Sequence, residues 1–148
     1  MSKELAAKAE RAAEWWLHSL GCVRTVRAVR TRYQRQDLFA CDVLGLHAEG
    51  RWIGVQVTTG GNTSVRPRRR KLEALPWSID DDVYLCELRV SPDPANRRRQ
   101  VYHFRVHELR VAARLRTLGG IVGDGGSLWE VWPEAVDVPR EWLRAMPR

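Results

Sequence analysis

Two apolar segments joined by a short turn constrain this chain more than any other feature. Residues 38–46 and 51–59 are each long enough to form a strand, and the turn between them ends at Gly50. Strands connected so closely pair antiparallel, as a hairpin. Apolar side chains fall on both faces of each strand, which is typical of strands covered on both sides. We therefore predict two central strands of a sheet that lies between layers of helix.

Further elements are predicted on both sides of this hairpin. Apolar side chains recur with helical spacing before Gly21, and an alternating segment with an arginine-lined side follows as an outer strand. The predicted elements are a helix at 3–20, strands at 22–29, 38–46 and 51–59, a flexible loop at 60–64, a short helix at 71–75, strands at 82–90 and 100–106, and a helix at 107–118. The resulting order, α-β-β-β-α-β-β-α, predicts an α/β fold with a mixed β-sheet flanked by helices.

The length of 148 residues fits one domain. We expect its core within residues 3–118 and a tail at 119–148, whose tryptophans cover the core or a subunit interface. The cysteines Cys22, Cys41 and Cys86 lie in apolar runs without metal-ligand spacing, so we interpret them as small buried side chains. No apolar run is long enough to span a membrane and no secretory signal begins the chain, so we expect a cytoplasmic protein.

The charge balance points toward nucleic acid. Lys and Arg total 25 against 18 acidic residues, which gives a net charge of +7 and a pI near 10.0. Nearly all the basic residues are arginines, whose planar fork suits phosphate groups. A GC-rich coding sequence or a thermophilic source is the alternative explanation. Two basic runs are the best candidates for contacts with DNA phosphates: Arg66, Arg68, Arg69, Arg70 and Lys71, and Arg97, Arg98 and Arg99.

One carboxylate stands out in the hairpin. Asp42 is an isolated acid within an otherwise apolar strand, where burying an unpaired carboxylate is costly. Such an acid is a candidate metal ligand, because hydrolysis of a phosphodiester with a divalent metal needs converging oxygen ligands. An aspartate at a strand end that accepts hydrogen bonds from loop amides is the alternative.

Two other elements can add polar groups to Asp42. On the second strand, the two-residue period puts Gln56 and Thr58 on one face, with Gln56 across the hairpin from Asp42. Gln56 is interpreted either as a ligand in the metal shell or as a partner of nearby backbone. Glu10 falls at the margin of the first helix's apolar face and can reach toward Asp42, although a solvated role is the simpler interpretation.

The segment around these residues resembles the archaeal-type Holliday junction resolvases of the PD-(D/E)xK nuclease superfamily. The resemblance covers residues 7–75 and rests on an Ala-Glu-Arg helix containing Glu10 that ends at Gly21, on Asp42, and on the strand Ile53-Gly54-Val55-Gln56-Val57-Thr58. The run QVTTGGN followed by a basic helix also resembles phage-encoded members. The resemblance implies a restriction-endonuclease-like fold.

The strand that resembles the family's Glu-x-Lys pair departs from it. In one register, Gln56 stands in place of the family's Glu and Thr58 in place of its Lys. In the other register, Gly54 stands in place of the Glu and Gln56 in place of the Lys. We prefer the first register because it keeps an oxygen ligand. Lys71 can supply an amine from the following helix, although a phosphate-binding or solvated role fits it equally well.

The resemblance implies an endodeoxyribonuclease that uses Mg²⁺ or Mn²⁺ on four-way or other branched DNA, acting as a homodimer, in the host-cell cytoplasm if it is phage-encoded. Glu10, Asp42, Gln56 and the carbonyl of Val57 would hold the metal, and Thr58 or Lys71 would position water. One alternative is a nuclease fold that binds DNA without cleaving it. Another is a nuclease of the same fold that acts on linear or nicked DNA.

Overall fold

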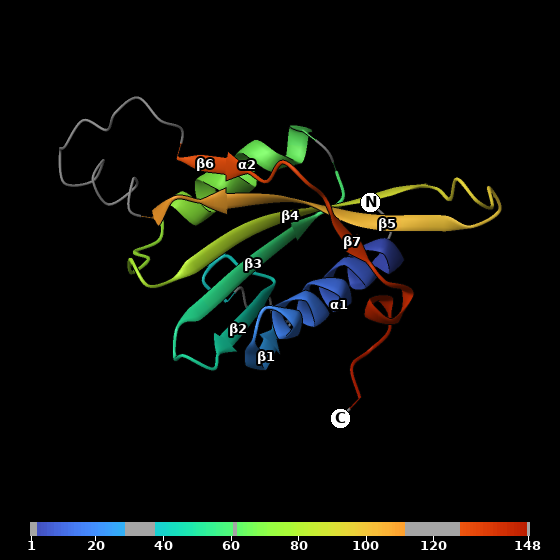
Figure 1. Ribbon diagram of the computed structural model, residues 1–148. Coiled ribbons are helices and arrows are strands. Elements are labelled where there is room, and N and C mark those ends of the chain that lie inside the picture. The colour runs from blue at the N-terminus through green and yellow to red at the C-terminus, as the bar shows by residue number, and fades with distance from the viewer. Residues whose placement is uncertain (1–2, 29–37, 61, 112–127, 148) are drawn as a thin grey trace.

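The computed structural model describes residues 3–28, 38–60, 62–111 and 128–147. It is a mixed α/β fold in which a curled seven-stranded sheet is flanked by helices (Figure 1). The elements are α1 (Lys3–Ser19), β1 (Cys22–Arg27), β2 (Val43–His47), β3 (Trp52–Thr58), α2 (Asn62–Glu73), β4 (Asp82–Pro92), β5 (Gln100–Leu109), β6 (Trp129–Val131), β7 (Val136–Val138) and a 3-10 turn, η1 (Arg140–Leu143).

The sheet has the order β1-β2-β3-β4-β5-β6, and β7 pairs with another part of β5. Strands β3 and β4 run parallel, with α2 as the connection between them, and the other pairs are antiparallel. The predicted hairpin of central strands is therefore confirmed as β2 and β3. The predicted outer strand is confirmed as β1, which lies at one end of the sheet.

The two helices bury opposite faces of the sheet. The apolar face of α1, which includes Ala9, Trp16 and Leu17, packs against side chains of β2 to β5. On the other face, Val65 and Leu72 of α2 pack with a separate set of core residues. Ile53, Val55 and Val57 of β3 belong to the layer under α1, whereas the other face of the strand carries Gly54, Gln56 and Thr58.

The segment after residue 128 packs onto this core. Trp132 lies edge-on to Trp16 of α1, with ring centroids 5.8 Å apart, and the backbone carbonyl of Arg144 accepts a hydrogen bond from Trp15 Nε1 at 2.9 Å. Trp129 of β6 is buried in the layer under α2. The part of the tail between residues 119 and 127 lies outside the described residues.

The predicted starts of the second strand and of the second helix were wrong. Residues 38–41 form a tight turn with positive φ at Phe39 and Ala40, so β2 begins only at Val43. The predicted loop at 60–64 is largely the first turn of α2, which runs from Asn62 through Pro67 and the arginine run and ends at Glu73. A proline inside a helix removes one backbone hydrogen bond, which is why the sequence favoured a helix starting later.

The helix predicted at 107–118 was wrong at its start, because residues 107–109 are the last part of β5. His107 and Leu109 pair there with Val131 and Trp129 of β6. This pairing joins segments distant in the chain, and local spacing carries no signal for it. Residues 112–118 lie outside the described residues. After residue 128, the described chain forms two short strands and η1.

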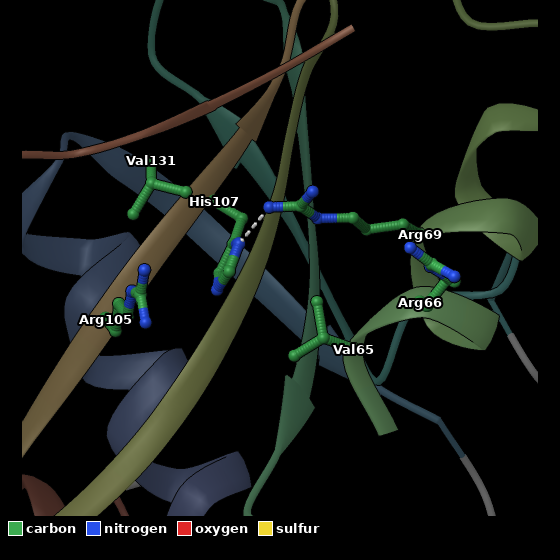
Figure 2. Close-up of a pocket in the computed structure, with 6 residues that line it drawn as sticks. All are labelled: Val65, Arg66, Arg69, Arg105, His107 and Val131. Carbon is green, nitrogen blue, oxygen red and sulfur yellow. Dashed lines mark hydrogen bonds between the residues drawn. The ribbon is translucent and has the colours of Figure 1, made fainter. Parts of the chain in front are cut away.

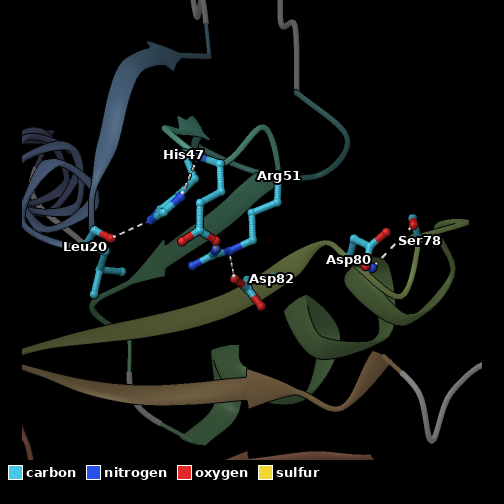
Figure 3. A network of polar contacts seen from close by, with 7 residues as sticks. Leu20, His47, Arg51, Ser78, Asp80 and Asp82 are labelled. Atoms are coloured by element: carbon cyan, nitrogen blue, oxygen red, sulfur yellow. Dashed lines mark hydrogen bonds and ion pairs between the residues drawn. The ribbon is translucent and has the colours of Figure 1, made fainter.

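Polar contacts fix the β2–β3 turn to its neighbours (Figure 3). Arg51 Nε donates to Asp82 Oδ2 at 2.8 Å, and Arg51 Nη1 donates to Glu49 Oε2 at 2.6 Å. His47 Nε2 lies 3.1 Å from the carbonyl oxygen of Leu20, at the end of α1. The turn is therefore connected both to the start of β4 and to the first helix.

Replacing Gly21 with Ala is expected to destabilise the fold. Gly21 has φ +105°, and a Cβ there would lie 2.6 Å from His47 Nε2. Positive φ alone costs a non-glycine residue about 1–2 kcal/mol, and displacing His47 adds to it. Gly50→Ala is the matched control, because Gly50 has φ +91° but a Cβ there would meet no atom within 4 Å. Urea unfolding should show a larger loss for Gly21→Ala, and equal losses would contradict the packing role of His47.

Candidate active site

A small cavity opens where α1, the start of β2, the end of β3 and α2 meet. Its volume is about 40 Å³, and we call it the Asp42 cavity. It is lined by Ala6, Ala9, Glu10, Asp42, Val57, Thr58, Thr59 and Arg68. Roughly 10–15 Å³ of such space is enough for one water molecule, so the cavity has room for a few waters or one ion. A larger group would have to bind at its mouth.

Asp42 is almost fully buried, with 2% of its surface exposed. Its Oδ2 accepts a hydrogen bond from the backbone N–H of Val57 at 2.8 Å, which connects the residue before β2 to the end of β3. Its own backbone N–H donates to the carbonyl of Val55, and its carbonyl accepts from the N–H of Ala28. Asp42 is therefore held by backbone from both neighbouring strands.

Glu10 reaches the same cavity from α1. It lies one residue beyond Ala9, which is fully buried against the sheet. Ala6 and Ala9 both line the cavity, and their small side chains leave space beside the sheet at this point. Sequence spacing had placed Glu10 at the margin of the apolar face, and the structure brings it together with Asp42 as expected.

Thr58 and Gln56 share one face of β3, as predicted, but they have different surroundings. The Thr58 hydroxyl lies 2.6 Å from Ser64 Oγ and accepts a hydrogen bond from Gly60 N–H at 3.2 Å, so it also anchors the turn into α2. Gln56 is absent from the lining of the cavity, and its Nε2 donates to the carbonyl of Ala40 at 2.7 Å. Gln56 thus braces the tight turn that precedes Asp42.

The basic run on α2 divides into inward and outward side chains. Arg68 lines the Asp42 cavity, and Arg69 turns toward the sheet, where its guanidinium lies 5.2 Å from the ring of Trp129. Arg70 and Lys71 are exposed on the outer side of the helix, and Arg66 is exposed beside the gap between α2 and β5. Lys71 does not line the cavity, and the basic residue of α2 that does so is Arg68.

The second basic run lies at the tip of the β4–β5 hairpin. Arg97, Arg98 and Arg99 are all exposed in the turn between Pro92 and Gln100. Because β3 and β4 are parallel, with Thr58 beside Glu87, the rest of β4 carries this tip past the carboxyl end of β3. Figure 1 shows the hairpin projecting beyond the rest of the sheet.

Sequence reasoning missed two polar residues, Thr59 and Glu87, and gave Arg68 only a general role in binding DNA. The Thr59 hydroxyl oxygen is buried at the cavity without a hydrogen-bond partner among the described residues. The Thr58-Thr59 pair at the end of an apolar strand was the available signal. Glu87 is 2% exposed on β4, and an acid within a strand of apolar residues was the signal there.

Glu87 pairs with His107 of β5 at 3.3 Å and with Arg89 at 3.2 Å. Burial alone would raise the pKa of Glu87, but the hydrogen bonds from His107 and Arg89 outweigh it and lower the pKa. Burial lowers the pKa of His107, and the positive charges of Arg69 and Arg105 lower it further, against the opposing effect of Glu87. We therefore treat His107 as a buried, neutral imidazole near neutral pH.

This pair predicts lower stability in mild acid. His107 has a folded pKa below its ordinary value of 6.5, so the unfolded chain binds protons first as the pH falls through that value. The free energy of unfolding should decrease from about pH 7.5 to about pH 5.5. Glu87, whose pKa is also lowered, should add a further decrease at more acidic pH. Urea unfolding across this range measures the effect.

The matched comparison uses His107→Gln and His103→Gln, because both histidines lie on β5. The decrease between about pH 7.5 and about pH 5.5 should become smaller in His107→Gln and persist in His103→Gln. An unchanged decrease in His107→Gln would show that another group causes it.

The oxygen atoms at the Asp42 cavity are compatible with a magnesium ion. Among the described residues, no group of three or more His, Cys, Asp or Glu side chains is placed to hold a metal. Mg²⁺, however, commonly uses only one or two protein carboxylates, together with water and substrate phosphates. Glu10 and Asp42 supply two carboxylates, and the buried hydroxyl of Thr59 is a further hard oxygen.

Comparison of the chain with protein-family models, curated proteins and solved structures gave no match. In the part of the chain that the structure describes, no helix is long and apolar enough to cross a membrane.

Proposed function

We propose that this chain is a metal-dependent endodeoxyribonuclease of the Holliday-junction-resolvase type, with its site at the Asp42 cavity. One observation carries the proposal. Two carboxylates from distant parts of the sequence, Glu10 and Asp42, line one cavity together with Arg68. Carboxylates beside a phosphate-binding cation are the groups that hydrolysis of a phosphodiester with a divalent metal requires.

The order of the elements supports a restriction-endonuclease-like core. A helix, three antiparallel strands, a second helix and a strand parallel to the third make up α1 to β4. In this proposal, β5, β6 and β7 are additions to that core. The cavity lies at the carboxyl end of β3, where β3 and the hairpin partner β2 are joined by the Asp42–Val57 hydrogen bond.

Glu10, Asp42 and the carbonyl of Val57 would hold Mg²⁺, which, when bound, would act as a Lewis acid and lower the pKa of water. The chain's own residues have separate tasks. Arg68 would donate hydrogen bonds to the scissile phosphate at the mouth of the cavity, and the hydroxyls of Thr58 and Thr59 would orient water. Gln56 is left out of the metal set, because it braces the turn at Ala40.

Binding of DNA is supported by two basic surfaces at the same end of the sheet. Arg66 and Arg70 line an exposed groove on α2, the helix that carries Arg68, and the β4–β5 hairpin carries Arg97, Arg98 and Arg99 past the end of β3. Contacts of this kind supply affinity without reading base sequence. A two-fold homodimer belongs to the proposal, because symmetric cleavage of a four-way junction needs two matched sites.

The test uses labelled four-way junction and linear duplex, each with Mg²⁺ or Mn²⁺ and with chelator. We expect nicking of the junction only with metal, slower nicking of linear duplex, and binding of DNA in chelator. Equal cleavage of both substrates would favour a nuclease of the same fold without junction selectivity. Binding of both without cleavage under any metal would contradict the proposal.

The second candidate is a nuclease fold that binds DNA without cleaving it. The observation that favours it is the position of Arg68, which lines a cavity of only about 40 Å³ together with both carboxylates. A guanidinium there can balance the acids in place of a metal. Calorimetric titration with Mg²⁺ separates the candidates, because the nuclease should bind the ion and the binding module should not.

Gln56→Glu tests whether Gln56 belongs to the metal set. Gln56 Nε2 donates a hydrogen bond to the carbonyl of Ala40. A carboxylate at this position has no proton to donate, so two oxygen atoms would face each other without a hydrogen bond. We expect Gln56→Glu to lower the free energy of unfolding by about 1–3 kcal/mol and to leave Mg²⁺ affinity no tighter. Gln56→Met is the neutral control. Tighter Mg²⁺ binding and faster cleavage by Gln56→Glu would place residue 56 among the metal ligands.

A further inference from the structure

A second basic pocket lies between α2 and β5, apart from the Asp42 cavity. It has a volume of about 220 Å³ and is lined by Val65, Arg66, Arg69, Arg105, His107 and Val131. Figure 2 shows the guanidinium of Arg69 directed at His107, with Arg105 and Arg66 on either side. Four of the six lining residues are basic or imidazole side chains, and none of the described lining residues is acidic.

The nearest acids are already engaged by other groups. Glu87 Oε2 pairs with both His107 and Arg89. Glu73 Oε1 accepts a hydrogen bond from Trp129 Nε1 at 2.6 Å. Burial lowers the pKa of Arg69, the negative charges of Glu73 and Glu87 oppose this, and the positive charge of Arg105 adds a smaller lowering effect. Like charges gathered at one place repel, so this arrangement favours an anion between them.

The pocket is built on a fixed framework. Arg69 Nη2 donates to His107 Nδ1, which leaves the proton of a neutral imidazole on Nε2, facing Glu87. Trp129 holds the Arg69 guanidinium by a cation–π contact at 5.2 Å. His107 is 3% exposed, so its ring is fixed by its surroundings. Donors held in place before binding lose little conformational entropy when a ligand arrives.

The chemistry and size of the pocket fit a single phosphate group. Guanidinium groups present paired donors that match phosphate oxygens. Pockets for drug-sized ligands measure about 300–1,000 Å³, so about 220 Å³ suits one phosphate better than a whole nucleotide. The walls of Val65 and Val131 offer no hydrogen-bonding side chain for a base or a sugar.

The pocket lies close to the Asp42 cavity without sharing its lining residues. Thr58 of β3 pairs with Glu87 of β4, which pairs with Arg105 of β5. Two strand spacings correspond to roughly 10 Å across the sheet. The neighbouring residues Arg68 and Arg69 of α2 face the cavity and the pocket respectively. A chain of DNA phosphates can therefore meet both places.

We propose that Arg66, Arg69 and Arg105, with His107 holding Arg69 in place, form a phosphate-binding pocket for a phosphate group other than the one at the Asp42 cavity. The assignment of that phosphate to DNA rests on the proposed function, whereas the binding of phosphate by the pocket does not. Two sources carry the same chemistry: a phosphodiester of the DNA backbone and a phosphate monoester, either free or at a strand end.

The first experiment follows thermal unfolding of the full chain in millimolar inorganic phosphate and in chloride of equal ionic strength. Arg105→Gln removes one exposed guanidinium of the pocket, and Arg140→Gln is the matched control on η1, which packs against α1. Phosphate should raise the Tm of the wild type and Arg140→Gln, with most of this gain lost in Arg105→Gln. Equal gains in all three proteins, or no gain in the wild type, would overturn the proposal.

Fluorescence anisotropy then separates the sources, using oligonucleotides with and without a 5′ phosphate at several salt concentrations. For a backbone phosphate, Arg105→Gln should weaken binding of both about tenfold and reduce the salt slope by about 1. For a terminal phosphate, Arg105→Gln should weaken only the phosphorylated strand. Unchanged DNA affinity, with loss of the effect of inorganic phosphate, would assign the pocket to free phosphate.

The result is independent of cleavage. If the wild type cleaves no DNA but Arg105→Gln still loses the phosphate effect, the proposed nuclease fails and the pocket stands. If DNA is cleaved but phosphate acts equally on Arg105→Gln and Arg140→Gln, the pocket fails and the nuclease stands.

Discussion

Replacing Asp42 with Asn is expected to lower the rate of magnesium-dependent DNA cleavage by roughly 1,000-fold. Asn keeps the shape of the side chain and an oxygen that can accept the hydrogen bond from Val57 N–H, which is 2.8 Å long in the wild type. It removes the negative charge, however, and leaves Glu10 as the single carboxylate among the residues that line the cavity. The loss should therefore fall on metal binding and catalysis.

Single-turnover cleavage of a labelled junction measures this effect, with DNA binding in chelator and thermal unfolding as controls. Binding should stay within about twofold of the wild type, because charge removal at a buried acid leaves the basic surface intact. Cleavage by Asp42→Asn at the wild-type rate would remove Asp42 from the site. An equal loss of binding and folding would instead show a structural role.

Removing the guanidinium of Arg68 has the second-largest expected effect. In the proposed nuclease, Arg68→Ala should lower the single-turnover rate by about 100-fold, because a charged donor to the scissile phosphate is lost. Arg68→Lys should recover part of this rate, since the charge returns without the planar fork. Arg70→Ala is the control on the outer side of α2 and should mainly weaken DNA affinity.

Arg68 also separates the two candidate functions. If the guanidinium stands in place of a metal, Arg68→Ala should bind Mg²⁺ more tightly than the wild type, because the two carboxylates lose their neutralising cation. If Arg68 serves catalysis, Mg²⁺ affinity should change little while the cleavage rate falls. Calorimetry and cleavage on the same preparation distinguish these outcomes.

The sequence predicted the centre of the fold because the governing signals there are local. Helical spacing ending at Gly21 identified α1, and two apolar segments joined by a short turn identified β2 and β3 as central strands. The predicted ends of helices and strands were wrong where tertiary contacts outweigh the local preference of the sequence for helix or strand. A tight turn at Phe39 and Ala40 stands where a strand was predicted. Helix α2 contains Pro67, although proline disfavours the interior of a helix. The end of β5 depends on pairing with β6, which no local pattern reveals.

The candidate site was predictable to the same degree. An acid in an apolar segment and an acid at the margin of a helix face identified Asp42 and Glu10, and the structure places both on one cavity. Side-chain direction was not predictable. The period of β3 put Gln56 and Thr58 on one face, but only the packed structure shows that Gln56 bonds Ala40. The arginine run similarly gave no indication that Arg68 and Arg69 point toward different places.

The most direct test of the central claim is the nicking rate of a labelled four-way junction by the wild-type chain as a function of Mg²⁺ concentration. The proposed site predicts no nicking in chelator, a rate that rises with Mg²⁺ and then saturates, and loss of that rise in Asp42→Asn. A junction that is fully bound yet never nicked, at any concentration of Mg²⁺ or Mn²⁺, would contradict it.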